Sequence, residues 1–194
     1  MIGQLKNAIE STVRQFREDP KSFLSERDIQ AVLFVELRKA TSDLRYTYDA
    51  KGKNHQFGFT DPLRIHPVTT EYHVYKEKHD CFDIAVLSED PDHDSDIWRQ
   101  PCRFAIEIKL WQPGYGEPRY LADVKKLQDY KAYLQKTFSG GREFMGIAML
   151  FVHPCVKLTP TAITEEKSGD AYPENGVALH LVTGTKEGHW WKQF

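Results

Sequence analysis

Two apolar segments of the chain carry charged residues at positions where a buried β-strand would have none. Asp83 stands in the segment 81–87 (CFDIAVL), and Glu107 and Lys109 stand in the segment 103–111 (RFAIEIKLW). Alternate side chains of a strand share a face, so Glu107 and Lys109 point the same way and leave the opposite face apolar. Charged groups among apolar neighbours are costly unless they are paired or functional. These three residues are therefore the first candidates for a site.

The chemistry that these residues suggest depends on a metal ion. If the two segments are antiparallel neighbours joined by the acidic segment 88–96, Asp83 and Glu107 converge on one face of the sheet. Close carboxylates repel unless a cation lies between them, and Mg²⁺ prefers such oxygen ligands. The ion would activate a water molecule and stabilise charge developing on a phosphate. Lys109 would orient that water or neutralise the transition state, and the carbonyl of Ile108 is a further candidate ligand.

The elements that position these residues follow from periodicity and from helix-end signals. Residues 3–17 carry an apolar stripe at helical spacing, which Asp19-Pro20 ends. A second helix is predicted to start at Ser25, an N-cap residue, with Asp28 completing a variant of the capping box. Further strands are expected at 69–75, 144–152 and 177–184, and a third helix at 119–138.

The remaining segments suggest how the chain is organised as a whole. The polar segment 43–67 predicts an excursion with a short hairpin, and the aromatic tail is expected to pair or pack at the edge of the sheet. A chain of 194 residues without repeats or linkers is long enough for one domain with a substantial core. We therefore predict a single domain over 1–194, with a core at 25–152 to which helix 3–17 and strands 177–194 are additions.

Composition excludes several classes of protein. Hydrophobic residues make up 40% and charged residues 28%, which is typical of a globular protein rather than a disordered chain. No segment has the ~20 apolar residues of a membrane span, and the first residues lack a secretion signal, so a cytoplasmic protein is expected. Cys81, Cys102 and Cys155 are expected to be free thiols packed as small buried hydrophobes. With a net charge of −2, any nucleic-acid contact must come from a local cationic patch.

Asp83 in CFDIAVL, followed by Glu107-Ile108-Lys109 in FAIEIKLW, resembles the motif of the PD-(D/E)XK nuclease superfamily. In that family the Asp and the Glu hold a metal ion, the Lys serves the nucleophile, and a Glu on the first core helix often assists. Glu26 matches this last position, because it precedes Ile29 and Leu33 on their core-facing helical stripe. The resemblance spans about residues 25–152 and includes the order of the elements.

Two features of the chain depart from the family motif. Phe82 stands where the motif has proline, and the separation between Asp83 and Glu107 is long, which we attribute to the acidic segment 88–96. Helix residues 123–130 (DVKKLQDY) resemble the family helix from which basic or amide residues approach the substrate.

The resemblance implies a restriction-endonuclease-like fold, a three-layer α/β/α sandwich around a mixed sheet. The first three strands would form a meander, and helix 119–138 would cross over to strand 144–152. It also implies Mg²⁺-dependent hydrolysis of DNA phosphodiesters, with Mn²⁺ as a substitute ion, in restriction, repair, or phage or mobile-element defence. Specificity would come from loops 43–67 and 153–176, from a homodimer, or from a partner protein.

Two other functions remain open at this point. The same fold can serve as a nucleic-acid-binding or protein-interaction module that does not cut. A metal-dependent hydrolase of small phosphoesters is the third reading, which a closed pocket around Glu107 rather than a wide cationic groove would favour. The intact set of Asp83, Glu107 and Lys109 favours the nuclease, because a non-cutting module has no chemical reason to keep it.

Several other residues have two interpretations each. Glu71 could face the site or solvent, and Lys126 and Gln128 could approach DNA or lie on a solvated helix face. Trp190 and Trp191 could stack on a base, or pack at the edge of the sheet. The eight histidines show no metal-ligand spacing and are expected at the surface or in ordinary packing.

Overall fold

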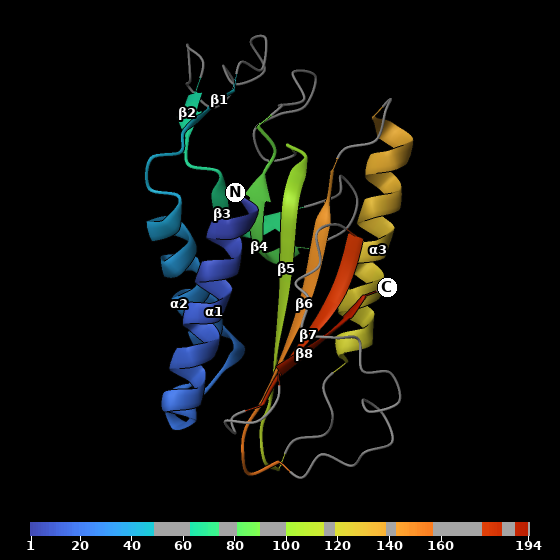
Figure 1. Ribbon diagram of the computed structural model, residues 1–194. Coiled ribbons are helices and arrows are strands. Elements are labelled where there is room, and N and C mark those ends of the chain that lie inside the picture. Colours follow the sequence, from blue (N-terminus) through green and yellow to red (C-terminus); the bar gives the residue numbers. More distant parts are fainter. Residues whose placement is uncertain are drawn as a thin grey trace.

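A computed structural model describes residues 1–48, 63–73, 81–89, 100–114, 119–138, 143–156, 176–183 and 189–193. These residues form an α/β fold in which a mixed sheet lies between two layers of helices (Figure 1). The helices α1 (Ile2–Glu18) and α2 (Glu26–Ala40) cover one face, and α3 (Tyr120–Thr137) covers the other. A short 3₁₀ helix, η1 (Pro20–Ser22), connects α1 to α2.

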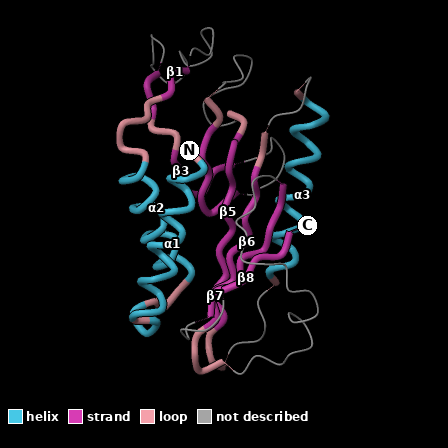
Figure 2. Tube along the Cα trace, in the orientation of Figure 1, coloured by secondary structure: helices cyan, strands magenta, loops and turns pink. Residues whose placement is uncertain are grey.

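The main sheet has six strands in the order β3-β4-β5-β6-β7-β8 (Figure 2). Their bounds are β3 (Val68–His73), β4 (Cys81–Leu87), β5 (Cys102–Trp111), β6 (Met145–Val152), β7 (Gly176–Thr183) and β8 (His189–Gln193). The first three form the predicted antiparallel meander, and α3 crosses over to β6, which is parallel to β5. β7 is parallel to β6, and β8 pairs antiparallel at the edge, as expected for the tail.

A second, smaller sheet pairs β1 (Tyr46–Tyr48) with β2 (Leu63–Ile65) in antiparallel register. It confirms the pairing expected within 43–67, of which residues 49–62 lie outside the described part of the chain. Most of the acidic segment 88–96, most of the loop 153–176 and the side chains of Trp190 and Trp191 lie outside it as well.

The helix ends follow the predicted local signals. α1 ends at Glu18, immediately before Asp19-Pro20. At the start of α2, the Asp28 carboxylate accepts hydrogen bonds from the backbone N–H groups of Ser25 at 2.8 Å and Leu24 at 2.9 Å. This confirms the capping box and holds the first turn of α2, which begins with Glu26, against the preceding chain.

The alternation predicted for β5 is confirmed by two separate hydrophobic cores. Phe104, Ile106 and Ile108 are buried against α1 and α2, together with Ile29 and Leu33 of α2. Ala105 belongs to the other core, which lies between the sheet and α3 and contains the α3 residues Val124, Leu127 and Tyr130. Glu107 and Lys109 occur at the same alternate positions as Ala105, so their side chains lie on the α3 side of the strand.

None of the three cysteines forms a disulfide bond within the described residues, and their burial differs from the prediction. Only Cys102 is buried, whereas Cys81 is half-buried and Cys155 is exposed. Cys81 begins β4 and Cys155 lies in the turn after β6, where apolar neighbours in the sequence do not ensure a covered position. Among the described helices, none has the length and apolar character needed to cross a membrane.

Gly146 allows α3 to pack close to β6. A Cβ atom at this position would lie 3.0 Å from the Leu127 Cβ and 3.1 Å from a Phe144 ring carbon. Gly146→Ala should therefore lower the free energy of unfolding by ~1–3 kcal/mol, the usual cost of overpacking a core. Urea denaturation measures this change. Gly3→Ala in α1 is the matched control. No atom would lie within 4 Å of its added Cβ, and alanine favours the helix, so this variant should not be destabilised. A Gly146→Ala variant as stable as the wild type would contradict the close approach.

Candidate functional site

Six charged residues from both helical layers and the sheet meet at one end of the molecule. This end lies where β5 finishes and where α2 and α3 begin (Figure 1). We call these residues the charged cluster: Glu26 of α2, Asp83 of β4, Glu107 and Lys109 of β5, and Asp123 and Lys126 of α3. All four residues predicted for catalysis belong to it.

Lys109 lies between carboxylates from opposite faces of the sheet. Its ammonium nitrogen is 3.5 Å from a carboxylate oxygen of Glu26 and 3.5 Å from one of Asp123, and it donates to the Ile108 carbonyl at 3.3 Å. Burial alone would lower the pKa of Lys109, but the surrounding carboxylates, led by Asp123 and Glu26, raise it above its ordinary value. The lysine is therefore held as a cation in a fixed position.

Glu107 is the most deeply buried member of the cluster, with 2% of its surface exposed. Its Oε1 atom lies 2.5 Å from Lys126 Nζ. Burial raises the pKa of Glu107 to about 8; Lys126 opposes the rise, and the carboxylates of Asp83 and Asp123 add to it. Desolvation thus outweighs the ion pair, and protonated Glu107 is stabilised in the folded chain.

Asp83 lies beside Glu107 on the neighbouring strand. The antiparallel pairs of β4 and β5 end at Ile84 and Ile106, the residues next to Asp83 and Glu107, and the charge of Asp83 acts on Glu107. One oxygen of Asp83 accepts the Ile108 N–H at 2.6 Å. Burial raises the pKa of Asp83, and the Ile108 N–H and the lysines Lys109 and Lys126 oppose the rise.

The ladder between β3 and β4 is irregular at Asp83. The register pairs Thr70 with Ile84 and Tyr72 with Phe82, and Glu71 between them has φ 49°, a left-handed conformation that is rare for a residue with a Cβ. Such strain costs of order 1–3 kcal/mol and is concentrated at functional sites. The strained backbone at Glu71 therefore marks the part of the sheet that carries Asp83 as a candidate functional segment.

Gln30 of α2 supports this irregular segment. Its side-chain amide donates to the Asp83 carbonyl at 2.6 Å and to Glu71 Oε1 at 3.1 Å. Glu71 is exposed to solvent, but its carboxylate also accepts a hydrogen bond from Gln30, which contacts Asp83. Both interpretations of Glu71, facing the site and facing solvent, are therefore met in part. Because Gln30 is 9% exposed, these bonds fix the backbone of Asp83 from inside the fold.

Sequence reasoning missed Asp123 and Gln30, and for Lys126 it offered only an approach to DNA or a solvated helix face. Lys126 does not lie on a solvated helix face, because it contacts Glu107 and donates to the Cys81 carbonyl at 2.8 Å. Gln128 is exposed, as that interpretation expects. The sequence did hold a signal for Asp123 and Lys126. They are three residues apart and directly precede the buried Val124 and Leu127, so they lie beside the buried stripe of α3.

Within the described residues, the cluster has no preformed metal geometry. No three His, Cys, Asp or Glu side chains in that part of the chain are placed to hold an ion. Lys109 and Lys126 lie among the carboxylates, where a cation would otherwise bind. The buried atoms Glu107 Oε1 and Asp123 Oδ2 have these ion-pair contacts but no aligned hydrogen bond.

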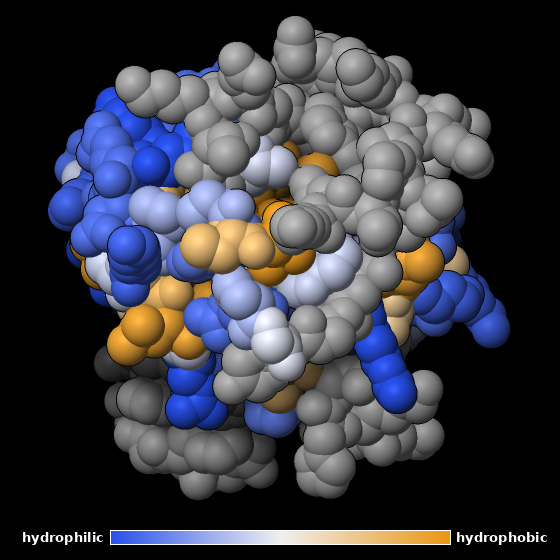
Figure 3. All heavy atoms as spheres, turned by 90° about the horizontal axis from the view of Figure 1, so that it is seen from below, coloured by the Kyte–Doolittle hydropathy of each residue, from blue (hydrophilic) through white to orange (hydrophobic). Residues whose placement is uncertain are grey.

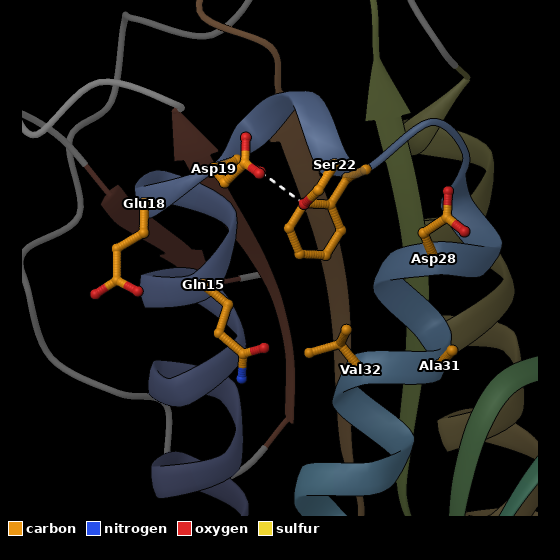
Figure 4. Close-up of a pocket in the computed structure, with 8 residues that line it drawn as sticks. Gln15, Glu18, Asp19, Ser22, Asp28, Ala31 and Val32 are labelled. Carbon is orange, nitrogen blue, oxygen red and sulfur yellow. Dashed lines mark hydrogen bonds between the residues drawn. The ribbon is translucent and has the colours of Figure 1, made fainter.

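A separate hollow of about 430 Å³ lies between the end of α1, η1 and the start of α2 (Figure 4). Gln15, Glu18, Asp28 and Val32 are among its lining residues, and none of the lining residues belongs to the charged cluster. The Ser22 hydroxyl donates to the Asp19 carbonyl at 2.8 Å at its edge. This hollow therefore lies outside the charged cluster.

Comparisons of the chain with protein-family models, with curated proteins and with solved structures found no match. The chemistry of the charged cluster is therefore the basis for inferring a function.

The raised pKa of Glu107 predicts a pH-dependent stability in the absence of metal. Between pH 4.5 and about 8 the folded chain keeps a proton that the unfolded chain releases, so the free energy of unfolding falls as pH rises. The slope from this group is at most about 1.4 kcal/mol per pH unit. Glu107→Gln should lose that slope and be more stable than the wild type near pH 8.

Urea denaturation in EDTA at several pH values measures the effect. Glu143→Gln is the matched control, because this carboxylate is 85% exposed and should leave the slope unchanged. Parallel stability curves for the wild type and Glu107→Gln would show that Glu107 does not carry the proton.

Proposed function

We propose that the chain is a metal-dependent nuclease that hydrolyses phosphodiester bonds in DNA, with a restriction-endonuclease-like fold of the PD-(D/E)XK type. The observation that carries the proposal is the convergence of Glu26, Asp83, Glu107 and Lys109 at one end of the sheet. The order α2, β3, β4, β5, α3 and β6, with a meander followed by a parallel crossover, is also the order that the resemblance implies.

The charged cluster has the donor set that a magnesium ion prefers. Its four carboxylates and two ammonium groups leave two negative charges when all are ionised, which a divalent cation would balance. The buried oxygens Glu107 Oε1 and Asp123 Oδ2, which lack aligned hydrogen bonds, are suited to such a hard cation. Asp83 and Glu107, with the Ile108 carbonyl, would hold the ion.

The bound ion would lower the pKa of a water molecule and stabilise charge on the phosphate. The chain itself supplies the positioned cation Lys109, which Glu26 and Asp123 hold from two sides. An ammonium group fixed in this way can neutralise charge that develops on the phosphate without reorganising. For Glu107 to hold the ion, Lys126 would have to move away from it, and its ammonium could then contact a phosphate oxygen.

One contact favours the alternative, a nucleic-acid-binding module that does not cut. The Lys126 ammonium contacts the Glu107 carboxylate, and a site that never binds metal would have the same contact. The two functions therefore differ in whether a divalent ion displaces Lys126.

Metal binding should raise the thermal stability of the chain. At a hundredfold excess over its dissociation constant, an ion that binds only the folded state stabilises it by about 2.7 kcal/mol. Asp83→Asn should abolish the shift, whereas Lys126→Ala should increase metal affinity, because the competing ammonium is gone. Thermal unfolding with Mg²⁺ or Mn²⁺ measures both changes. A wild-type melting curve that millimolar Mg²⁺ and Mn²⁺ leave unmoved would support the non-cutting module.

Lys109→Ala should separate cutting from binding. Loss of a positioned catalytic group should lower single-turnover cleavage by ~10²-fold or more, while metal still binds. The assay uses saturating linear, branched and single-stranded DNA with Mg²⁺ or Mn²⁺. Lys125→Ala is the matched control, because it removes one positive charge from an exposed position on α3. Wild-type protein that binds these substrates and cuts none would refute the nuclease.

A further inference from the structure

The antiparallel ribbon of β1 and β2 has one face in the core and the other in solvent. Its register pairs Tyr46 with Ile65 and Thr47 with Arg64. Tyr46 and Ile65 pack in the hydrophobic core that lies between the main sheet and α3. Because cross-strand partners share a face and faces alternate along a strand, Thr47 and Arg64 lie on the opposite face, and both are exposed.

Arg45 directly precedes this ribbon and is also exposed. Its Nη1 atom donates to the backbone carbonyls of Ser42 at 2.8 Å and Leu44 at 2.6 Å. These bonds hold the guanidinium group against the turn that connects α2 to β1, and among the described contacts only Nη1 is engaged. The carboxylate in that turn, Asp43, accepts instead from the Ser42 hydroxyl at 3.3 Å.

His66 shows that further positive charge gathers beside the ribbon. It directly follows β2, two positions after Arg64. Burial lowers the pKa of His66, and the charges of Arg38 of α2 and Arg45 lower it further. Both guanidinium groups therefore lie close to this ring. Arg38 is held over the Phe34 ring, with its Cζ atom 5.6 Å from the ring centroid. We call Arg38, Arg45 and Arg64 the arginine group.

No carboxylate neutralises the arginine group within the described part of the chain. None of its three members forms an ion pair there. Two carboxylates of this end of the molecule pair with other cations: Glu36 of α2 contacts Lys39 at 3.0 Å, and Glu89 lies 3.8 Å from Arg103. The three guanidinium groups are therefore available to an anionic ligand.

The end of the molecule with the charged cluster is a poor place for DNA to bind without metal. The four carboxylates and two ammonium groups of the cluster leave a net charge of −2 when all are ionised. Figure 3 shows apolar residues interspersed with hydrophilic ones at that end. The arginine group lies at the other end of α2, a helix of 15 residues that spans about 22 Å (Figure 1). The cations that attract a polyanion are therefore separate from the groups proposed to react with it.

We propose that the arginine group binds the phosphate backbone of duplex DNA, with the solvent face of the β1–β2 ribbon at the major groove. The choice of DNA rests on the proposed function, but binding through the ribbon does not depend on cutting. Duplex DNA carries one negative charge per ~1.7 Å of its axis, so neighbouring phosphates can meet several arginines at once. The guanidinium fork matches the geometry of a phosphate, and the Thr47 hydroxyl on the same face is a further donor to phosphate oxygens.

Duplex DNA fits this surface better than duplex RNA or a membrane. The major groove of B-form DNA is about 12 Å wide and admits a two-stranded ribbon, whereas the deep, narrow major groove of A-form RNA does not. A membrane-binding surface combines cations with exposed apolar side chains that enter the lipid. Among the side chains that the structure describes, none of the exposed large apolar residues belongs to the ribbon.

The test measures binding of a short fluorescent DNA duplex by anisotropy as NaCl is raised, in EDTA so that no divalent ion competes and nothing is cut. Arg45→Gln/Arg64→Gln should weaken binding ~10-fold or more at about 0.1 M NaCl. It should also lower the slope of log K against log salt by about 2, about 1 for each lost phosphate contact. Because Arg45 also bonds backbone carbonyls, Arg64→Glu is measured alone. It breaks no described hydrogen bond or ion pair and should lower the slope by about 1 or more.

The matched control is Arg14→Gln/Lys136→Gln, which removes two exposed positive charges from α1 and α3. Its affinity and salt slope should stay close to those of the wild type. Equal losses in the control and in the ribbon variants would show attraction by overall charge and overturn the inference. A wild type that does not bind the duplex, or that binds duplex RNA or anionic phosphatidylserine vesicles more tightly, overturns it as well.

Cleavage of the same duplex in Mn²⁺ is measured separately. If the wild type cuts while the ribbon variants bind as tightly as the wild type, the ribbon inference fails and the nuclease stands. If binding depends on the arginine group and nothing is cut, the ribbon inference stands with the non-cutting module.

Discussion

The ion pair between Glu107 and Lys126 is the interaction on which the rest of the site depends. A carboxylate that is 2% exposed loses most of its hydration, and one ammonium group 2.5 Å away does not restore it. The pair nevertheless connects three elements, because Lys126 of α3 also donates to the Cys81 carbonyl at the start of β4. The contact is therefore better explained as a way to hold β4, β5 and α3 in register than as a source of stability.

A second constraint acts on the opposite side of the sheet. Gln30 reaches from α2 to the Asp83 carbonyl and to Glu71, whose backbone is left-handed. The Asp83 carboxylate is thereby free to accept the Ile108 N–H next to Glu107. The two helical layers thus act on neighbouring strands from opposite faces, α2 on β4 through Gln30 and α3 on β5 through Lys126. Their joint effect is to keep the carboxyl groups of Asp83 and Glu107 together, and the raised pKa of Glu107 is part of the cost of doing so.

The elements were predictable from the sequence because their signals are local. Alternation in 103–111, the apolar run 144–152 and the Ser25–Asp28 cap each report on a few consecutive residues. Asp123 and Lys126 were not predictable in the same way, since a charged residue beside an apolar stripe looks the same whether it meets solvent or a buried carboxylate. The outcome depends on how closely α3 approaches the sheet, which Gly146 and Leu127 decide over a long sequence separation.

The same arrangement accounts for the absence of a preformed ion site among the described carboxylates. Four acids so close together would repel each other strongly, and the two lysines reduce that repulsion without any ligand. In the proposed reaction Asp83 and Glu107 would hold a divalent ion that takes over this role, and the charge of Lys126 would then add to the attraction for a polyanion. Ion and nucleic acid would then favour each other's binding, because a Lys126 ammonium that no longer contacts Glu107 could contact a phosphate. Lys126, which contacts Glu107 in the folded chain, would on this reasoning be the group that couples metal binding to substrate binding.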